Sequence, residues 1–173
     1  MESEFKGNIK TAILATLASP KSLIRGQIAS ILAQIGKIEV PRKEWDELIP
    51  SMCTNSKSED INIRLASLKT LGYICEELQT NDLDDTTKNL IILALLQNLM
   101  TEEVANGVLE PSRLAIAAFV DSIPFTAPNF QKEEERNFIM EKIFNACGSA
   151  DESIQENSLH CLREIAVQEY DFI

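Results

Sequence analysis

The chain has 173 residues, 45% hydrophobic and 25% charged, and no apolar run near the roughly 18 residues that a membrane-spanning helix needs. No basic segment leads into an apolar one at its start, so we expect neither a membrane partner nor a secretory signal. Its 16 basic and 27 acidic residues give a net charge of −11, which disfavours nucleic-acid partners and suits either basic protein partners or a surface that only keeps a scaffold in solution.

Four segments share one spacing of apolar side chains, counted forward from a polar residue. Apolar residues stand four, seven and ten positions after that residue, on one face of a helix. The polar residues are Arg25, Arg64, Arg113 and Gln155. The aligned apolar residues are Ala29, Leu32, Ile35, Leu68, Leu71, Ile74, Ala117, Val120, Ile123, Leu159, Leu162 and Ile165.

The copies lie 39, 49 and 42 residues apart. Repeats of about forty residues are typical of HEAT and armadillo proteins. We therefore predict an all-α fold, a right-handed superhelical solenoid of about four HEAT-like repeats. The predicted repeats cover residues 1–38, 39–82, 83–126 and 127–173, the third with a longer loop between its helices.

Each repeat is expected to hold an outer helix A and an inner helix B, antiparallel and joined by a short loop. In the first repeat these helices are expected at about Lys6–Leu17 and Lys21–Gly36, with the glycine as a left-handed cap. Pro41 opens the second A helix. The second B helix contains Ile63–Ile74 and ends near Leu78.

The third A helix is expected at about Thr86–Met100, behind a possible cap at Asp85. Pro111 begins the third B helix, since a first-turn proline loses no helical hydrogen bond. The loop at 101–110 accounts for the longer interval of 49 residues.

The fourth pair of helices is expected at Gln131–Cys147 and from Glu152 to about Tyr170. No polar capping repeat follows the last helix, and a solenoid that ends in this way would expose the face meant for a next repeat. We therefore expect the chain to be a piece of a longer protein.

Two of the outer helices carry more apolar residues than one helical face can hide. Residues 90–96 are apolar in succession and cover every face of two turns, and residues 138–140 lie beside 143–144 in the fourth A helix. Most of these side chains are expected in the core. Some must reach the outer surface, where a patch of them would mark a binding site.

The sequence holds no cluster typical of an enzyme or a metal site. Its one histidine, His160, lies in a predicted B helix, and its paired carboxylates fall at helix ends or in loops. Neither the histidine nor the cysteines have metal-ligand spacing. We expect no catalytic residue, no metal and no cofactor. The four cysteines are expected to be reduced thiols in an intracellular protein: Cys53, Cys75, Cys147 and Cys161.

The polar residue that begins each repeat pattern is expected to be structural. In HEAT-type repeats an arginine at this point commonly forms a ladder that joins neighbouring repeats. We predict this role for Arg25, Arg64 and Arg113, with Gln155 at the last rung, where the charge is dispensable.

Four segments resemble the importin β family of nuclear import karyopherins, in order and at similar separation. Glu44–Pro50 resembles the family's W-P-E-L-I-P segment, and Leu71–Glu76 is similar to its G-Y-I-C segment. Ser122–Phe130 and Glu134–Met140 match two further segments. The resemblance covers about Trp45–Tyr170. The first repeat matches in pattern only, and 104–110 resembles a short insertion relative to the family.

This resemblance implies a protein-binding nuclear import receptor, without enzymatic activity, that moves between cytoplasm, nucleus and the nuclear pore. Family members bind the Phe-Gly repeats of nucleoporins through outer A helices and Ran·GTP through inner B helices. The resemblance places importin α and cargo on parts of the parent protein outside this segment. An alternative is a HEAT scaffold of another pathway, such as a phosphatase regulatory subunit or an adaptor.

The family's nucleoporin-binding residues carry over to the two outer helices with surplus apolar side chains. One wall of the groove would be Ile92, Leu93 and Leu96; the other would be Glu135, Phe138 and Ile139. Residues one helical turn apart can face a common groove. Leu93 stands where the family often has a small polar residue. The alternative is that these side chains are ordinary core between repeats.

Overall fold

The computed structural model describes residues 2–99 and 106–172, and this part of the chain is helical, with no strand. The all-α solenoid is confirmed. The helices are α1 (Glu2–Leu14), α2 (Ser22–Glu39), α3 (Leu48–Asn55), α4 (Ile61–Glu77), α5 (Asp85–Leu96), α7 (Glu110–Ser122), α8 (Ala127–Phe130), α9 (Glu133–Cys147) and α10 (Glu152–Gln168). Short 3-10 turns cover Thr80–Asp82, Ile123–Phe125 and Tyr170–Phe172.

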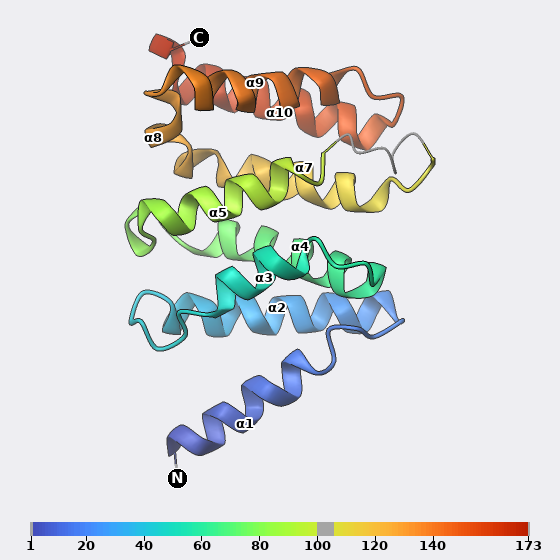
Figure 1. Cartoon of the computed structure of the whole chain (residues 1–173), viewed down its shortest axis with the longest axis vertical. Coiled ribbons are helices and arrows are strands. Elements are labelled where there is room, and N and C mark those ends of the chain that lie inside the picture. The colour runs from blue at the N-terminus through green and yellow to red at the C-terminus, as the bar shows by residue number, and fades with distance from the viewer. Residues whose placement is uncertain (1, 100–105, 173) are drawn as a thin grey trace.

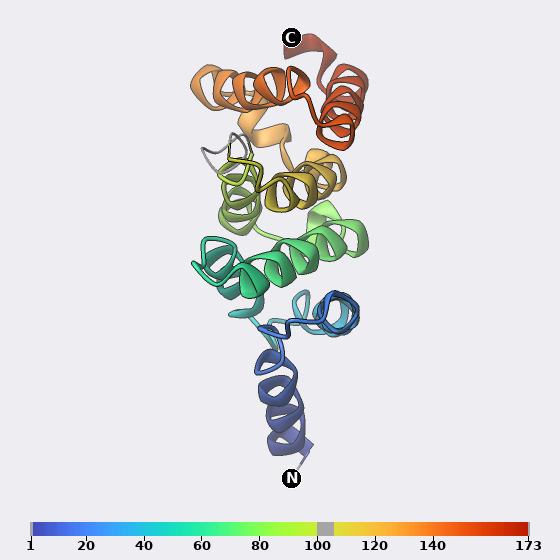
Figure 2. The same cartoon turned by 90° about the vertical axis from the view of Figure 1, so that its right-hand side faces the viewer.

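The helices form two layers that run the length of the molecule (Figure 1). Turned by 90°, the molecule shows α2, α4, α7 and α10 stacked in one layer and α3, α5 and α9 in the other (Figure 2). Within the inner layer α4 packs against both α2 and α7, and α7 packs against α10. Each predicted repeat thus holds an outer and an inner helix, although the exact repeat boundaries stay predictions.

The core lies between the two layers and follows the predicted spacing at ten of the twelve aligned positions, which are buried or half-buried. In α4, the three aligned residues Leu68, Leu71 and Ile74 are fully buried. A helix with one apolar stripe gains stability by removing that stripe from water. This burial orients each inner helix against its neighbours.

The predicted register is wrong at one position in each of the last two inner helices. Ala117 of α7 is exposed, and Leu159 of α10 is 55% exposed. In their place the core receives Phe119 and Cys161, both fully buried. Phe119 removes far more apolar area from water than Ala117 could, so α7 turns to bury the larger side chain.

Gly36 lies inside α2 rather than capping it, because the helix continues to Glu39. A Cβ at Gly36 would lie 2.8 Å from Leu48 Cδ2, so the glycine allows α3 to approach α2 closely. The second outer helix begins at Leu48 and not at Pro41. Residues 40–47 form a turn in which Lys43 has a φ of 57°, in the left-handed region.

The first and third outer helices also end earlier than predicted, at Leu14 and Leu96. The cap of α5 is Asp84 rather than Asp85: its Oδ1 accepts a hydrogen bond from the backbone N–H of Thr87 at 2.7 Å. Part of the predicted loop at 101–110 lies outside the described residues, as do positions 100 and 173.

The first two predicted rungs of the ladder hydrogen-bond to the following repeat. Arg25 Nη1 donates to Asn62 Oδ1 at 2.9 Å, and Asn62 lies in the first turn of α4. Arg64 Nε donates to Asn98 Oδ1 at 2.8 Å, just beyond the end of α5. Both bonds cross from one repeat to the next.

The third rung is an ion pair. Arg113 Nη2 lies 2.5 Å from Asp151 Oδ2, and Asp151 also caps α10 by accepting from the backbone N–H of Ile154 at 3.1 Å. The last rung differs: Gln155 Nε2 donates to the carbonyl oxygen of Cys147, at the end of its own outer helix. The contribution of the ladder to stability stays a prediction.

Candidate functional site

One groove on the outer face brings together all six residues predicted to bind nucleoporins. It lies between α5 and α9, encloses about 290 Å³, and is closed off at one side by α8. The lining residues are Asn89, Ile92, Leu93, Leu96, Asn129, Glu134, Glu135, Phe138 and Ile139.

The groove has a buried floor and two exposed apolar edges. Ile92, Leu96 and Ile139 are at most 2% exposed, so they also belong to the core between repeats. Leu93 is 44% exposed and Phe138 is 38% exposed, one on each wall. Large apolar side chains left half in water on facing walls can gain stability by covering a further apolar group.

Lys142 lies beside the exposed edge on α9. Its Nζ is 5.6 Å from the centroid of the Phe138 ring, within the range of a cation–π contact. This contact places a positive charge beside the ring at the edge of the groove.

The end of the groove near α8 is polar. Asn129 Nδ2 donates to Asn89 Oδ1 at 2.6 Å and to Glu135 Oε2 at 2.8 Å, so one amide links α5 to α9. Lys132 Nζ donates to Glu135 Oε1 at 2.9 Å. These hydrogen bonds, first from Lys132 and then from Asn129, lower the pKa of Glu135 below its ordinary value, because both stabilise the ionised form.

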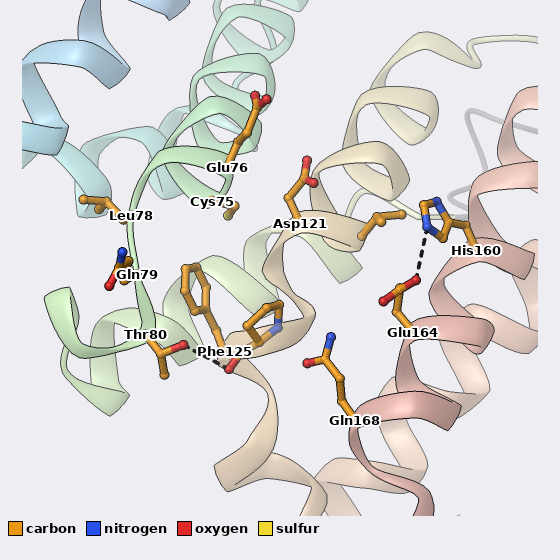
Figure 3. Close-up of a pocket in the computed structure, with 12 residues that line it drawn as sticks. Cys75, Glu76, Leu78, Gln79, Thr80, Asp121, Phe125, His160, Glu164 and Gln168 are labelled. Atoms are coloured by element: carbon orange, nitrogen blue, oxygen red, sulfur yellow. Dashed lines mark hydrogen bonds and ion pairs between the residues drawn. The ribbon is translucent and has the colours of Figure 1, made fainter.

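A second concave site lies on the inner face, between α4, α7 and α10, and encloses about 560 Å³ (Figure 3). Glu76, Asp121 and Glu164 bring one carboxylate from each of these helices, and no lysine or arginine lines the cleft. His160 Nε2 lies 3.4 Å from Glu164 Oε1. No residue of the described part of the chain forms an ion pair with Glu76 or Asp121.

Two carboxylates of this inner cleft, Glu76 and Asp121, repel each other, whereas Glu164 is paired with Arg163 Nη2 at 2.7 Å, which lowers the pKa of Glu164. Burial and the nearby Glu76 carboxylate raise the pKa of Asp121 above its ordinary value, and His160 acts in the opposite direction. A cation brought into the cleft would lower the free energy of the two carboxylates that lack an ion pair, Glu76 and Asp121.

No protein-family model matches the chain. Importin subunit beta-1 of Saccharomyces cerevisiae is 34% identical to it over 174 residues, which cover 98% of this chain and 20% of that protein. Two solved structures of Kap95, the yeast importin-beta, share its fold. The Kap95:Nup1 complex matches with a TM-score of 0.87 and 32% identity, over 98% of this chain and 20% of that one.

The second structure shows Kap95p whose binding induces the switch loops of RanGDP to adopt the GTP-bound conformation. It matches with a TM-score of 0.87 and 31% identity, over 98% of this chain and 19% of that one. This chain is homologous to one segment of importin β. It spans only 19–20% of the length of these relatives.

Similarity to importin β accounts for the HEAT-like stacking. The set of groove residues predicted from the sequence was incomplete. Asn89, Asn129 and Glu134 line the groove, and none of them was predicted from the sequence. Asn129 stands within the family-like segment Ser122–Phe130, yet nothing in that segment shows that a short α8 turns its amide toward α5 and α9. Only the folded importin-like stack brings these residues together.

The thiols of this importin relative are poor nucleophiles. Burial raises the pKa of Cys53 and of Cys161 to about 12, and it also raises the pKa of Cys75. Cys147 is half-buried, and burial raises its pKa as well. Within residues 2–99 and 106–172, no group of histidine, cysteine or carboxylate side chains could hold a metal ion.

None of the helices in the described part of the chain is both long and apolar enough to span a membrane.

Proposed function

We propose that this chain is a segment of a nuclear import receptor and that its groove between α5 and α9 binds the Phe-Gly sequences of nucleoporins. The observation that carries the proposal is the convergence of six residues, from two helices far apart in sequence, on one apolar groove. The complex of the relative Kap95 with Nup1 supports it. The proposal is one of protein binding, since the relatives are importins and not enzymes.

The shape of the groove suits a single aromatic side chain. A phenyl ring would rest on the floor made by Ile92, Leu96 and Ile139, between the exposed edges at Leu93 and Phe138. Burying one phenylalanine is worth roughly 1.5–3 kcal/mol before the cost of association. One such contact is weak and quickly released. Many such contacts on a repetitive partner retain the receptor through high effective concentration, which suits passage through a pore.

An NMR titration of the chain with a peptide that contains one Phe-Gly pair tests this proposal. We expect the shifts to map to α5 and α9 and to be lost in Phe138→Asp, because the substitution places a charge at the mouth of an apolar groove. Phe144→Asp is the matched control: Phe144 lies on the same helix, is 58% exposed and does not line the groove. Unchanged shifts in a folded Phe138→Asp variant would contradict the proposal.

The inner layer supports a second, separate contact, with Ran·GTP. Glu76, Asp121 and Glu164 face one cleft from three successive inner helices, and the relative Kap95p acts on the switch loops of Ran. Such a row of carboxylates attracts a basic protein surface. Calorimetry with GTP-loaded Ran should show weaker binding to Asp121→Asn than to the wild type, and equal binding would exclude the cleft from this contact.

The remaining family functions belong to the longer parent protein. We propose that importin α or cargo binds outside this segment and that the parent protein occurs in the cytoplasm, in the nucleus and at the nuclear pore. A pull-down with nucleoporin repeats separates this function from that of a HEAT scaffold in another pathway, which would not bind them.

A further inference from the structure

The polar end of the outer groove is built around a single buried amide. Asn129 lies on α8, between the walls formed by α5 and α9, and is only 6% exposed. Its Nδ2 reaches both walls, with Asn89 Oδ1 at 2.6 Å on one side and Glu135 Oε2 at 2.8 Å on the other. The amide therefore sets both the distance between the walls and the position of the carboxylate.

The orientation of this amide follows from its partner. An ionised carboxylate only accepts hydrogen bonds, so the atom of Asn129 that faces Glu135 must be the NH₂ donor. The amide oxygen then points elsewhere, and it is buried without a hydrogen-bond partner in the described part of the chain. A buried acceptor without a partner costs folding free energy. Asn129 therefore holds this position at a cost to stability, as a residue that serves binding often does.

The carboxylate that Asn129 holds still has room for another donor. Glu135 accepts one hydrogen bond at each oxygen, from Lys132 at Oε1 and from Asn129 at Oε2. A carboxylate has about four acceptor positions, so each oxygen can accept one more. Glu135 lies at the edge of the apolar groove and is half-exposed, within reach of a main-chain N–H from a segment bound there.

We propose that Asn129 is a positioning residue of the groove: it fixes the Glu135 carboxylate to accept the main-chain N–H of the residue that follows a bound aromatic side chain. This inference rests on the proposed binding of Phe-Gly sequences and explains why glycine should follow the ring. A residue without a Cβ lets its N–H approach a carboxylate that is recessed between Lys132 and Asn129.

The first experiment uses the wild-type chain and two peptides that differ at one atom. In the second peptide an ester replaces the amide between phenylalanine and glycine, which removes the N–H and keeps the ring. We expect affinity for the ester to fall roughly tenfold, as for a lost hydrogen bond to a charged group. Equal affinity for the two peptides would overturn the proposal.

The second experiment is a double-mutant cycle on the same chain. Asn129→Ala should weaken binding of the amide peptide by roughly tenfold, and the same substitution in a Glu135→Ala background should change affinity by less than about twofold. A purely structural asparagine would weaken binding equally in both backgrounds, and that result would also overturn the proposal.

Two further variants serve as controls, one inside the groove and one outside it. Asn89→Ala removes the other anchor of the amide and should weaken binding less than Asn129→Ala, since the bond to Glu135 remains. Asn137→Ala, an exposed position on α9 outside the groove, should leave affinity unchanged. A wild-type chain that binds neither peptide would refute Phe-Gly binding itself. Binding of both peptides with equal affinity would refute only the role of Asn129.

Discussion

The two concave sites of this solenoid lie on opposite layers and differ in chemistry. The outer groove has a buried apolar floor, and its carboxylate, Glu135, is already paired with Lys132 and Asn129. The inner cleft gathers three carboxylates, and two of them, Glu76 and Asp121, lack an ion-pair partner among the described residues. A stack of paired helices thus offers one face to apolar contact and the other to electrostatic attraction.

Each of the two sites is made by neighbouring repeats in the stack and not by one repeat. The outer groove needs α5 and α9 at one spacing, and the inner cleft needs α4, α7 and α10 side by side. Both spacings depend on α7, which packs against α4, α5 and α10.

The largest expected effect comes from breaking both sites at once through α7. Phe119→Ala removes a fully buried ring and should lower the free energy of unfolding by about 3–5 kcal/mol in urea denaturation. Leu159→Ala on α10 is the control, since its side chain is 55% exposed and should cost less than about 1 kcal/mol. A larger loss from Leu159→Ala would show that the repeat register predicted from the sequence was right after all.

A charge introduced into the outer groove should weaken binding there and leave binding in the inner cleft unchanged. Leu93→Asp should weaken binding of a Phe-Gly peptide by more than about tenfold, because an unpaired carboxylate opposes burial of the ring. The same variant should keep its affinity for GTP-loaded Ran, since Leu93 lies on the outer layer. Parallel calorimetry with both ligands measures this, and a loss of Ran binding would show that the sites are coupled.

The binding affinities of the two sites should also differ in their dependence on salt concentration. Raising ionic strength from about 0.05 M to about 0.5 M shortens the screening length several-fold, which weakens attraction to exposed carboxylates. We expect binding of a basic protein surface in the inner cleft to weaken strongly, and binding of the Phe-Gly peptide to change little. Equal salt dependence of the two affinities would mean that the outer groove also binds mainly by charge.

The smallest expected effect is a difference in titration between the two sites. Asp121 has a raised pKa and Glu135 a lowered pKa, so Asp121 should titrate above the range of an ordinary aspartate and Glu135 below the range of an ordinary glutamate. Carbon-13 NMR of the carboxyl groups would measure both pKa values. Titration of Glu135 at or above the pH of an ordinary glutamate would contradict the assigned hydrogen bonds.

The same shifts have opposite consequences for stability. The contribution of Glu135 is present above its ordinary pKa and is lost as the pH falls through its lowered pKa, since folding favours its ionised form. The contribution of Asp121 is present below its ordinary pKa and is lost as the pH rises through its raised pKa. Asp121→Asn should therefore slightly raise the midpoint of thermal unfolding at pH 7, whereas Glu135→Gln should lower it.

Most of the fold could be predicted because HEAT-like repeats are held together by contacts between neighbouring helices. The spacing of Leu68, Leu71 and Ile74 predicts an inner helix, and these residues are fully buried. The predictions of helix ends and of buried positions were wrong where these depend on the neighbouring helix. Gly36 was predicted as a cap, yet it lies inside α2, where the absence of a side chain lets Leu48 of α3 approach closely.

The all-α repeat architecture, the resemblance to importin β and the six residues carried over to the outer groove could be predicted from the sequence alone. This was possible because apolar periodicity and short family-like segments are local properties of the chain. The folded structure was needed to show which of those six residues form the floor and which form the exposed edges, and that Asn129 links the two walls. The reason is physical: burial and hydrogen bonding between helices depend on their relative rotation and spacing, which packing of the whole stack sets.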